Sequence, residues 1–260
     1  MGRVLAITNR KGGSGKTSCA VNLAAEWAAA LPPRPDGPRA RVLLVDLDSQ
    51  GHCAVGLGVQ PARGAPTVHG FLAGRHALRP AIVPTPVPGL DLVPADPLFE
   101  HGQARPDERT LARALREEGL AEAYEVILLD TPPSLDLLLL NALCAAERVV
   151  VPLMPHHLSA EGVKQLARLM FRVSSQGLNP QLRLLGFLPV MLDGRIGVHR
   201  QVLADLGRQF GPQRLLPGIR NDIRVAEAFG AGKPVRLHAP GARATADFGQ
   251  ALQALRERWV

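Results

Sequence analysis

Short apolar runs alternate along this chain with segments whose hydrophobic residues recur every three or four positions. The runs are rich in Val, Ile and Leu, as expected of strands that are buried on both faces of a sheet. Strands are predicted at 4–7, 42–45, 90–94, 126–129, 149–153 and 183–190, and near 214–219. Helices are predicted at 17–31, near 67–74, at 107–122, around 135–146, at 159–175 and 197–210, near 223–229 and at 242–258.

This alternation predicts an α/β fold, in which helices on both faces cover a mostly parallel, twisted sheet. Neither an internal repeat nor a clear linker divides the sequence, so residues 1–260 are expected to form a single domain. Ligands in such folds bind at the carboxyl ends of the strands. Because Asp46 and Asp130 each end an apolar run, both are expected at that edge of the sheet.

Composition narrows the class of protein. Hydrophobic residues make up 46% of the chain, which is enough for a sizeable core and argues against disorder. No apolar run reaches the ~18 residues of a transmembrane helix, and the first residues lack the layout of a signal peptide. The cysteines, Cys19, Cys53 and Cys144, lack a metal or redox spacing, so they are expected to be buried in a protein of the reducing cytosol.

A glycine-rich segment follows the first predicted strand and opens the first helix. It reads KGGSGKTS over residues 11–18. Gly12, Gly13 and Gly15 allow backbone N–H groups to turn inward around phosphate oxygens, and the helix N-terminus adds a favourable dipole. The segment therefore predicts a site for the phosphates of a nucleotide.

The polar side chains of the same segment suit this chemistry. Lys16 is placed to reach the β- and γ-phosphates of the nucleotide, and the Thr17 hydroxyl is placed to hold Mg²⁺. The general P-loop pattern has glycine where this chain has Arg10. The order of strand, glycines, Lys-Thr and helix is nevertheless the one that the pattern requires.

Lys11 at the head of the loop and Lys16 at its foot form the signature KGGxGKT, which resembles the deviant Walker A motif of the ParA/MinD family of ATPases. The resemblance implies a P-loop ATPase of the deviant Walker type that uses ATP and Mg²⁺. It also implies that Lys11 reaches across an ATP-dependent homodimer to the partner's nucleotide. The residues implied to contact the nucleotide are Lys11, Gly12, Gly13, Ser14, Gly15, Lys16, Thr17 and Ser18.

Carboxylates that follow two of the predicted strands have the chemistry to hold a metal or to orient an attacking water. DLDSQG at 46–51 resembles the family's DxDPQG switch, with Ser in place of Pro. By this resemblance Asp48 positions the hydrolytic water and Asp46 lies in the outer shell of the metal. DTPPS at 130–134 resembles the family's Walker B and second switch, which implies that Asp130 contacts Mg²⁺ directly or through water.

Most of the chain resembles the small chromosomal, Soj-type ParA proteins. The segments that carry this resemblance are Leu90 to Pro94, Pro152 to Gly162, Met191 to Arg195, Arg224 to Ala228 and Gly232 to Val235. The resemblance implies slow ATP hydrolysis and non-specific binding of double-stranded DNA by the ATP-bound dimer. It further implies release by a ParB-like protein or another cargo adaptor, segregation of a chromosome or plasmid, and a cytoplasmic, nucleoid-associated location.

Other functions remain open from the sequence. A ParA-like protein can position another cargo, such as a carboxysome or a chemotaxis array. A MinD-like regulator of division sites would act on a membrane surface, but the last predicted helix is expected to pack on the domain, so a membrane partner is not expected. A metabolic P-loop enzyme, such as a kinase or an amidoligase, would need an acceptor site that the sequence does not reveal.

The excess of basic charge lies in the second part of the chain. Residues 151–260 carry 15 basic and 7 acidic residues, whereas residues 1–150 carry 15 and 16. Neutralising phosphates gives salt-dependent affinity without sequence preference, although solvated arginines also serve solubility. The candidate DNA-binding residues are two that match family positions, Arg195 and Arg224, and two near them in the sequence, Arg200 and Arg220.

Three segments depart from the family pattern. The family's I-P-R-N-V-R becomes IRNDIR at 219–224, and because Pro and Asn at these positions help to recognise adenine, the contacts to the base stay open. A position that is acidic in the family is occupied here by His156, and His157 follows it. Neither histidine has a metal-ligand companion at a fixed spacing, so structural or surface roles are expected for both. The proline-rich loop 32–38 lengthens a connection that is usually short.

Overall fold

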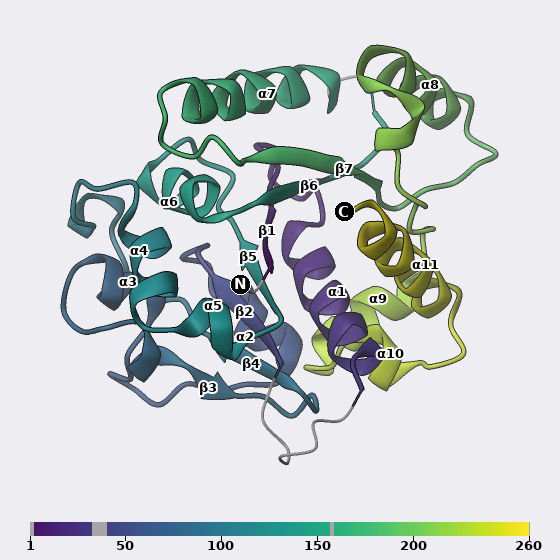
Figure 1. Cartoon of the computed structure of the whole chain (residues 1–260). Helices are drawn as coiled ribbons and strands as arrows, with labels where there is room; N and C mark the ends of the chain where they lie inside the picture. Colours follow the sequence, from purple (N-terminus) through teal and green to yellow (C-terminus); the bar gives the residue numbers. More distant parts are fainter. Residues whose placement is uncertain (1–2, 33–40, 157–158, 260) are drawn as a thin grey trace.

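The computed structural model describes residues 3–32, 41–156 and 159–259 (Figure 1). Most of the proline-rich loop, residues 33–38, and His157 lie outside the described residues.

Seven strands form one sheet within the described residues, in the order β3-β4-β2-β5-β1-β6-β7. All neighbouring strands are parallel except the edge pair β3 and β4, which is antiparallel. The prediction of a mostly parallel sheet is therefore confirmed. The bounds are β1 Arg3–Ile7, β2 Val42–Asp46, β3 Val83–Pro84, β4 Leu90–Val93, β5 Val126–Asp130, β6 Arg148–Leu153 and β7 Arg183–Pro189.

Helices cover both faces of this sheet, as predicted. The α-helices are α1 Lys16–Ala30, α2 His52–Leu57, α3 Val68–Leu72, α4 Thr110–Glu117, α5 Leu120–Ala123, α6 Leu137–Ala145, α7 Ser159–Ser175, α8 Gly197–Phe210, α9 Ile223–Gly230, α10 Val235–His238 and α11 Arg243–Arg258. Three short 3₁₀ turns are η1 Arg79–Ala81, η2 His101–Gln103 and η3 Pro212–Arg214.

Alternate residues of each strand enter one of two hydrophobic clusters. On β1, Val4 and Ala6 pack with α3, α4, α6 and α7, whereas Leu5 and Ile7 pack with α1, α2 and α11. Figure 1 shows α1, α9, α10 and α11 grouped on one side of the strands and α3 to α6 on the other. This two-sided burial explains why the strands are continuously apolar.

Two predicted elements differ from the structure. The helix expected at 107–122 is divided into α4 and α5 by Gly119, whose backbone is left-handed with φ 64. The strand expected near 214–219 is reduced to single bridges, Phe187 with Leu215 and Leu192 with Arg220. Pro217 within this segment has no N–H to donate to a sheet ladder, which explains its irregular path.

The terminal helix α11 packs on the domain, as predicted. Phe248, Leu252 and Leu255 on its inner face are buried in the cluster that also contains α1. Trp259, just beyond the helix, meets Trp27 of α1 edge-on, with ring centroids 5.8 Å apart. In the described part of the chain, no helix combines the length and the apolar character that crossing a membrane requires.

Candidate nucleotide site

The candidate site forms where β1, β2 and β5 end side by side. The parallel register pairs Asp130 of β5 with Ile7 on one side and with Asp46 of β2 on the other. Both carboxylates are completely buried. The edge that the sequence predicted for a ligand is therefore lined by two acidic side chains.

The loop between β1 and α1 turns tightly around an open helix end. Gly13 and Gly15 have φ values of 68 and 81, in the left-handed region where a side chain is strained. A Cβ on Gly15 would also come within 3.3 Å of the Val190 side chain. Among the residues that the structure describes, no side chain caps the N-terminus of α1, so the N–H groups of its first turn can bind an anion.

The two lysines of the loop lie in different environments. Lys16 is only 6% exposed, and its Nζ donates to the carbonyl oxygen of Lys11 at 3.5 Å. Burial lowers the pKa of Lys16, while the negative charges of Asp130 and Asp48 raise it. Lys11 itself is exposed. The buried lysine can therefore bind phosphate within its own site, and the exposed lysine faces outward.

The first switch segment is ordered by its own carboxylates. Asp46 accepts hydrogen bonds from the amide of Asp48 through Oδ1, at 3.2 Å, and from the amide of Cys53 through Oδ2, at 3.0 Å. The Asp48 carboxylate accepts from the Gln50 amide at 3.0 Å and is only partly buried. Asp46 therefore fixes the backbone of this segment through hydrogen bonds. The Asp48 carboxylate instead lines a cavity in front of the loop.

Asp130 is held in a nearly dry environment. Burial raises its pKa from the ordinary 3.8 to about 6, although interactions with the Thr17 hydroxyl and the Cys53 thiol lower it. Burial and the neighbouring Asp130 charge likewise raise the pKa of Asp46 well above its usual value. Among the described residues, no donor is well aligned on Asp130 Oδ1. A cation would offset the burial of two adjacent carboxylates, and the oxygen donors of Thr17, Asp46 and Asp130 fit a Mg²⁺ ion.

A cavity of about 680 Å³ opens in front of these groups. This volume lies in the usual range for a site that takes one small molecule or cofactor. Its lining begins at Gly12 to Cys19 of the loop, passes Asp48 and Pro133, and ends on residues 219–223, Phe229 and Phe248. The charged phosphate loop thus forms one end of the cavity. The other end, formed by residues 219–223, Phe229 and Phe248, is mostly apolar with a few polar groups.

The far end of the cavity contains the segment that departs from the family pattern. The guanidinium of Arg220 pairs with Asp247 of α11, with Nη2 at 2.7 Å from Oδ1, and the Arg220 amide donates to Oδ2 at 2.9 Å. Asp222 caps α9 by accepting from the Arg224 amide at 3.1 Å. Arg220, predicted as a DNA contact, therefore lies on the cavity wall with its charge paired.

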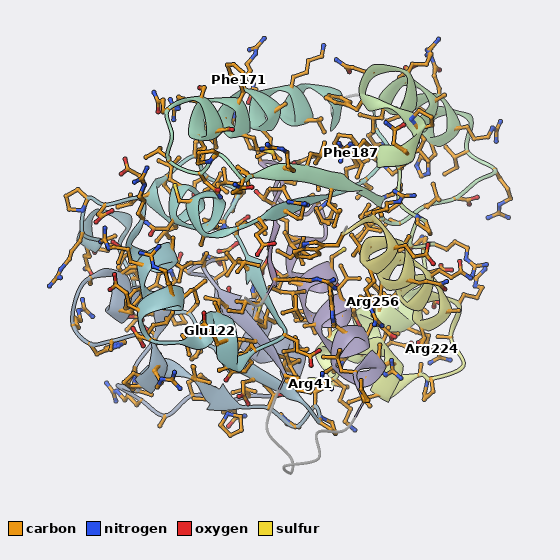
Figure 2. All side chains as sticks on the ribbon, in the orientation of Figure 1. Arg41, Glu122, Phe171, Phe187, Arg224 and Arg256 are labelled. Atoms are coloured by element: carbon orange, nitrogen blue, oxygen red, sulfur yellow. The ribbon has the colours of Figure 1, made fainter. Side chains whose placement is uncertain are left out.

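The other three candidate arginines are exposed, as Arg220 is, but they do not line the cavity. The Arg195 side chain is 91% exposed and pairs with Asp193 at 2.7 Å. The Arg200 guanidinium donates to the carbonyl oxygen of Gly194 at 2.7 Å, which ties α8 to the same loop. Arg224 pairs with Glu227 at 2.6 Å, and Figure 2 shows it at the periphery of the molecule.

Two hydrogen bonds join the segments that carry these arginines. The amide of Leu192 donates to the carbonyl oxygen of Ile219 at 2.9 Å, and the amide of Asn221 donates to that of Leu192 at 3.1 Å. The loop that contains Arg195 and the segment that leads to Arg224 therefore run side by side. Both also contribute to the cavity, so the arginines lie beside the nucleotide site.

His156 and its neighbour in space, His199, show no sign of a metal site. Their rings meet edge-on with centroids 5.6 Å apart, and Nδ1 of the buried His199 accepts from the Asp193 amide at 3.2 Å. Within the described residues, the one group of metal-binding side chains lies elsewhere, at Asp46, Cys53 and Asp130.

Two residues of the site escaped the sequence analysis. Cys53 is buried, as expected, and its thiol also donates to Asp130 Oδ2 at 3.4 Å. Asp247, which anchors Arg220, lies within the terminal helix and belongs to no motif. The only sequence signal for Cys53 was its position two residues after the DLDSQG segment.

Comparison with known proteins agrees with this geometry. A family model described as an AAA domain matches residues 2–184. The chain is 44% identical over 238 residues to the chromosome-partitioning ATPase Soj of Thermus thermophilus, covering 92% of this chain and 89% of that one. It is 39% identical over 241 residues to the chromosome partitioning protein ParA of Caulobacter vibrioides, covering 91% and 87%.

A solved structure is similar over the whole length of the chain. It is described as cobyrinic acid a,c-diamide synthase from Mycobacterium smegmatis with a bound ATP analogue and magnesium. The TM-score is 0.77 at 33% identity, and the match covers 100% of this chain and 96% of that one.

Proposed function

Since this chain belongs to the ParA/Soj family of P-loop ATPases, we propose that it is a partition ATPase whose ATP-bound dimer binds DNA without sequence preference and leaves it on hydrolysis. The proposed cargo is a chromosome or plasmid. A ParB-like or similar adaptor stimulates the slow intrinsic hydrolysis, and the protein acts in the cytoplasm on the nucleoid as one domain.

The observation that carries this proposal is the separation of the two loop lysines. Lys16 is buried inside the loop, whereas Lys11 is exposed at its outer edge. An exposed lysine at this position can neutralise the phosphates of a nucleotide that a second copy holds. Leu135 directly follows the second switch segment and is 50% exposed, which supports a contact surface beside the site.

Different residues of the site are proposed to bind the phosphates, to hold Mg²⁺ and to orient the attacking water. Backbone N–H groups of residues 12–18 and the Lys16 ammonium would hold the phosphates, and Thr17 with Asp46 and Asp130 would hold Mg²⁺. The metal would supply positive charge to the phosphate oxygens. Asp48 would orient the attacking water from the cavity wall. An adaptor would act by moving the segments that carry these aspartates.

The DNA surface of this proposal is tested by removing two charges from it. Changing Arg195 and Arg224 together to Ala is expected to weaken binding to duplex DNA in the presence of ATP. It should also lower the slope of log affinity against log salt by about two, because each phosphate contact contributes about one. The measurement is a DNA retardation series over several salt concentrations.

The matched control removes the same charge from the exposed surface of α7. Arg168 and Arg172 are exposed on this helix, which Figure 2 shows, through Phe171, far from Arg224. Their double change to Ala should leave the salt slope close to that of the parent protein. Equal losses in the two double variants would show that only net charge matters and would contradict the proposed surface.

The similarity to the mycobacterial synthase suggests a second function, amide formation on an acid such as cobyrinic acid. Such a reaction needs an acceptor bound beside the γ-phosphate. The cavity of about 680 Å³ is lined by the phosphate loop and by the segment at 219–229. Partition is favoured because the Thermus and Caulobacter relatives, which share higher identity with this chain than the mycobacterial synthase does, are both partition proteins.

A further inference from the structure

A thiol lies between the two buried carboxylates of the site. One ligand atom from each of Asp46, Cys53 and Asp130 lies within 4.8 Å of the other two. The three side chains come from the end of β2, the start of α2 and the end of β5, and all are completely buried. The Cys53 thiol donates to Asp130 Oδ2 at 3.4 Å, and the Cys53 amide donates to Asp46 Oδ2 at 3.0 Å.

The cluster has an unused acceptor and too little positive charge. Asp130 Oδ1 is buried, and no described residue provides it with a well-aligned donor. The positive charge of Lys16 acts on Asp130, and the two carboxylates Asp46 and Asp130 also act on each other. One lysine therefore faces two acidic side chains. Burying carboxylates without a partner is costly, so a further cation would stabilise the cluster.

We propose that, when no nucleotide is bound, Asp46, Cys53 and Asp130 form a binding site for a thiophilic divalent cation such as Zn²⁺, which would take the place of the hydrated Mg²⁺ that accompanies ATP. Two carboxylate oxygens and one sulfur are the three protein ligands of a tetrahedral zinc site that keeps a fourth position open. Sulfur favours Zn²⁺ over Mg²⁺, which takes oxygen ligands. On binding, the Cys53 thiol loses its proton to solvent and the thiolate coordinates the cation.

An ion at this position would fasten the first switch segment to the sheet. Asp46 and Cys53 begin and end the segment that contains Asp48, and Asp130 lies on the neighbouring strand β5. The cluster borders the cavity through Asp48 and Thr17, so an ion can enter from that side. Bound Zn²⁺ would therefore hold Asp48 in one position and inhibit any hydrolysis that needs the segment to move.

The test is Co²⁺ binding to the full-length protein without nucleotide, with Zn²⁺ as a competitor. Absorption from thiolate-to-cobalt charge transfer reports a sulfur ligand directly. The parent protein should develop this band and lose it when Zn²⁺ is added. Cys53→Ser and Cys53→Ala should show no band, and their affinity for Zn²⁺ should fall at least about 10-fold, the lower limit for removing even an indirect partner of a metal.

The other two cysteines provide matched controls. Cys19 is buried, and this burial together with the charge of Asp130 raises the pKa of its thiol. Cys144 is buried on α6, and neither cysteine belongs to the cluster. Cys19→Ser and Cys144→Ser should keep the band. A band that survives in both Cys53 variants, or that is absent from the parent, would overturn the proposal. Because no nucleotide is present, this outcome is independent of whether the protein is an ATPase.

Discussion

Lys16→Ala is expected to abolish ATP binding at nucleotide concentrations that saturate the parent protein. Lys16 is 6% exposed and lies at the open end of α1, where its ammonium would neutralise phosphate oxygens. Removing one partner of a buried charge pair costs about 2–5 kcal/mol. This cost corresponds to a rise in Kd of roughly 30-fold to 5,000-fold, which equilibrium binding of a fluorescent ATP analogue can measure.

Lys11→Ala is the matched control for this change. It removes the same charge from the same loop, but from an exposed position. A monomer with this change should bind ATP nearly as well as the parent and should fail to form the ATP-dependent dimer in size-exclusion chromatography. If Lys16→Ala bound ATP within a few-fold of the parent, the phosphate-binding role of Lys16 would be wrong.

Asp48→Ala is expected to stop hydrolysis while preserving the binding of both ATP and DNA. The Asp48 carboxylate lines the cavity and is fixed in place by the amide of Gln50, while the Asp48 amide is held by Asp46. Loss of a group that orients or deprotonates the attacking water should lower the turnover rate by about 10²–10⁴-fold. Phosphate release with saturating ATP measures this loss, and a retardation assay measures DNA binding.

Asp48→Asn serves as the control for shape. The amide keeps the size of the side chain but not its charge, so it should be nearly as inactive as Asp48→Ala. Normal turnover in the alanine variant would exclude the proposed role of Asp48. A loss of ATP binding in both variants would place Asp48 among the residues that hold the nucleotide instead.

The parts of the site that lie close together in the sequence were predictable. The phosphate-binding segment at 11–18 leads from β1 into α1, and each acidic switch begins at the last residue of its strand. The order of strand, loop and helix could be predicted because apolar runs and glycine spacing determine local structure within a few residues. The parallel sheet then brings Asp46 and Asp130 together, since neighbouring parallel strands end at the same edge.

The contacts that depend on tertiary packing were not predictable. Asp247 is 27 residues from Arg220 in the sequence, and no motif around it predicts that the two side chains pair. Cys53 is 77 residues from Asp130, and only the pairing of β2 with β5 brings its thiol to the carboxylate. The apolar residues near 214–219 predicted a strand, but Pro217 has no N–H to donate to a sheet ladder, so a regular strand does not form there.

Dependence of DNA binding on the bound nucleotide tests the central claim most directly. The parent protein is mixed with a non-specific duplex in the presence of ATP, ADP or no nucleotide, at two salt concentrations. Retardation is expected only with ATP and should weaken at the higher salt concentration, because phosphate contacts release counterions. Equal retardation in all three nucleotide states would contradict an ATP-gated DNA-binding dimer.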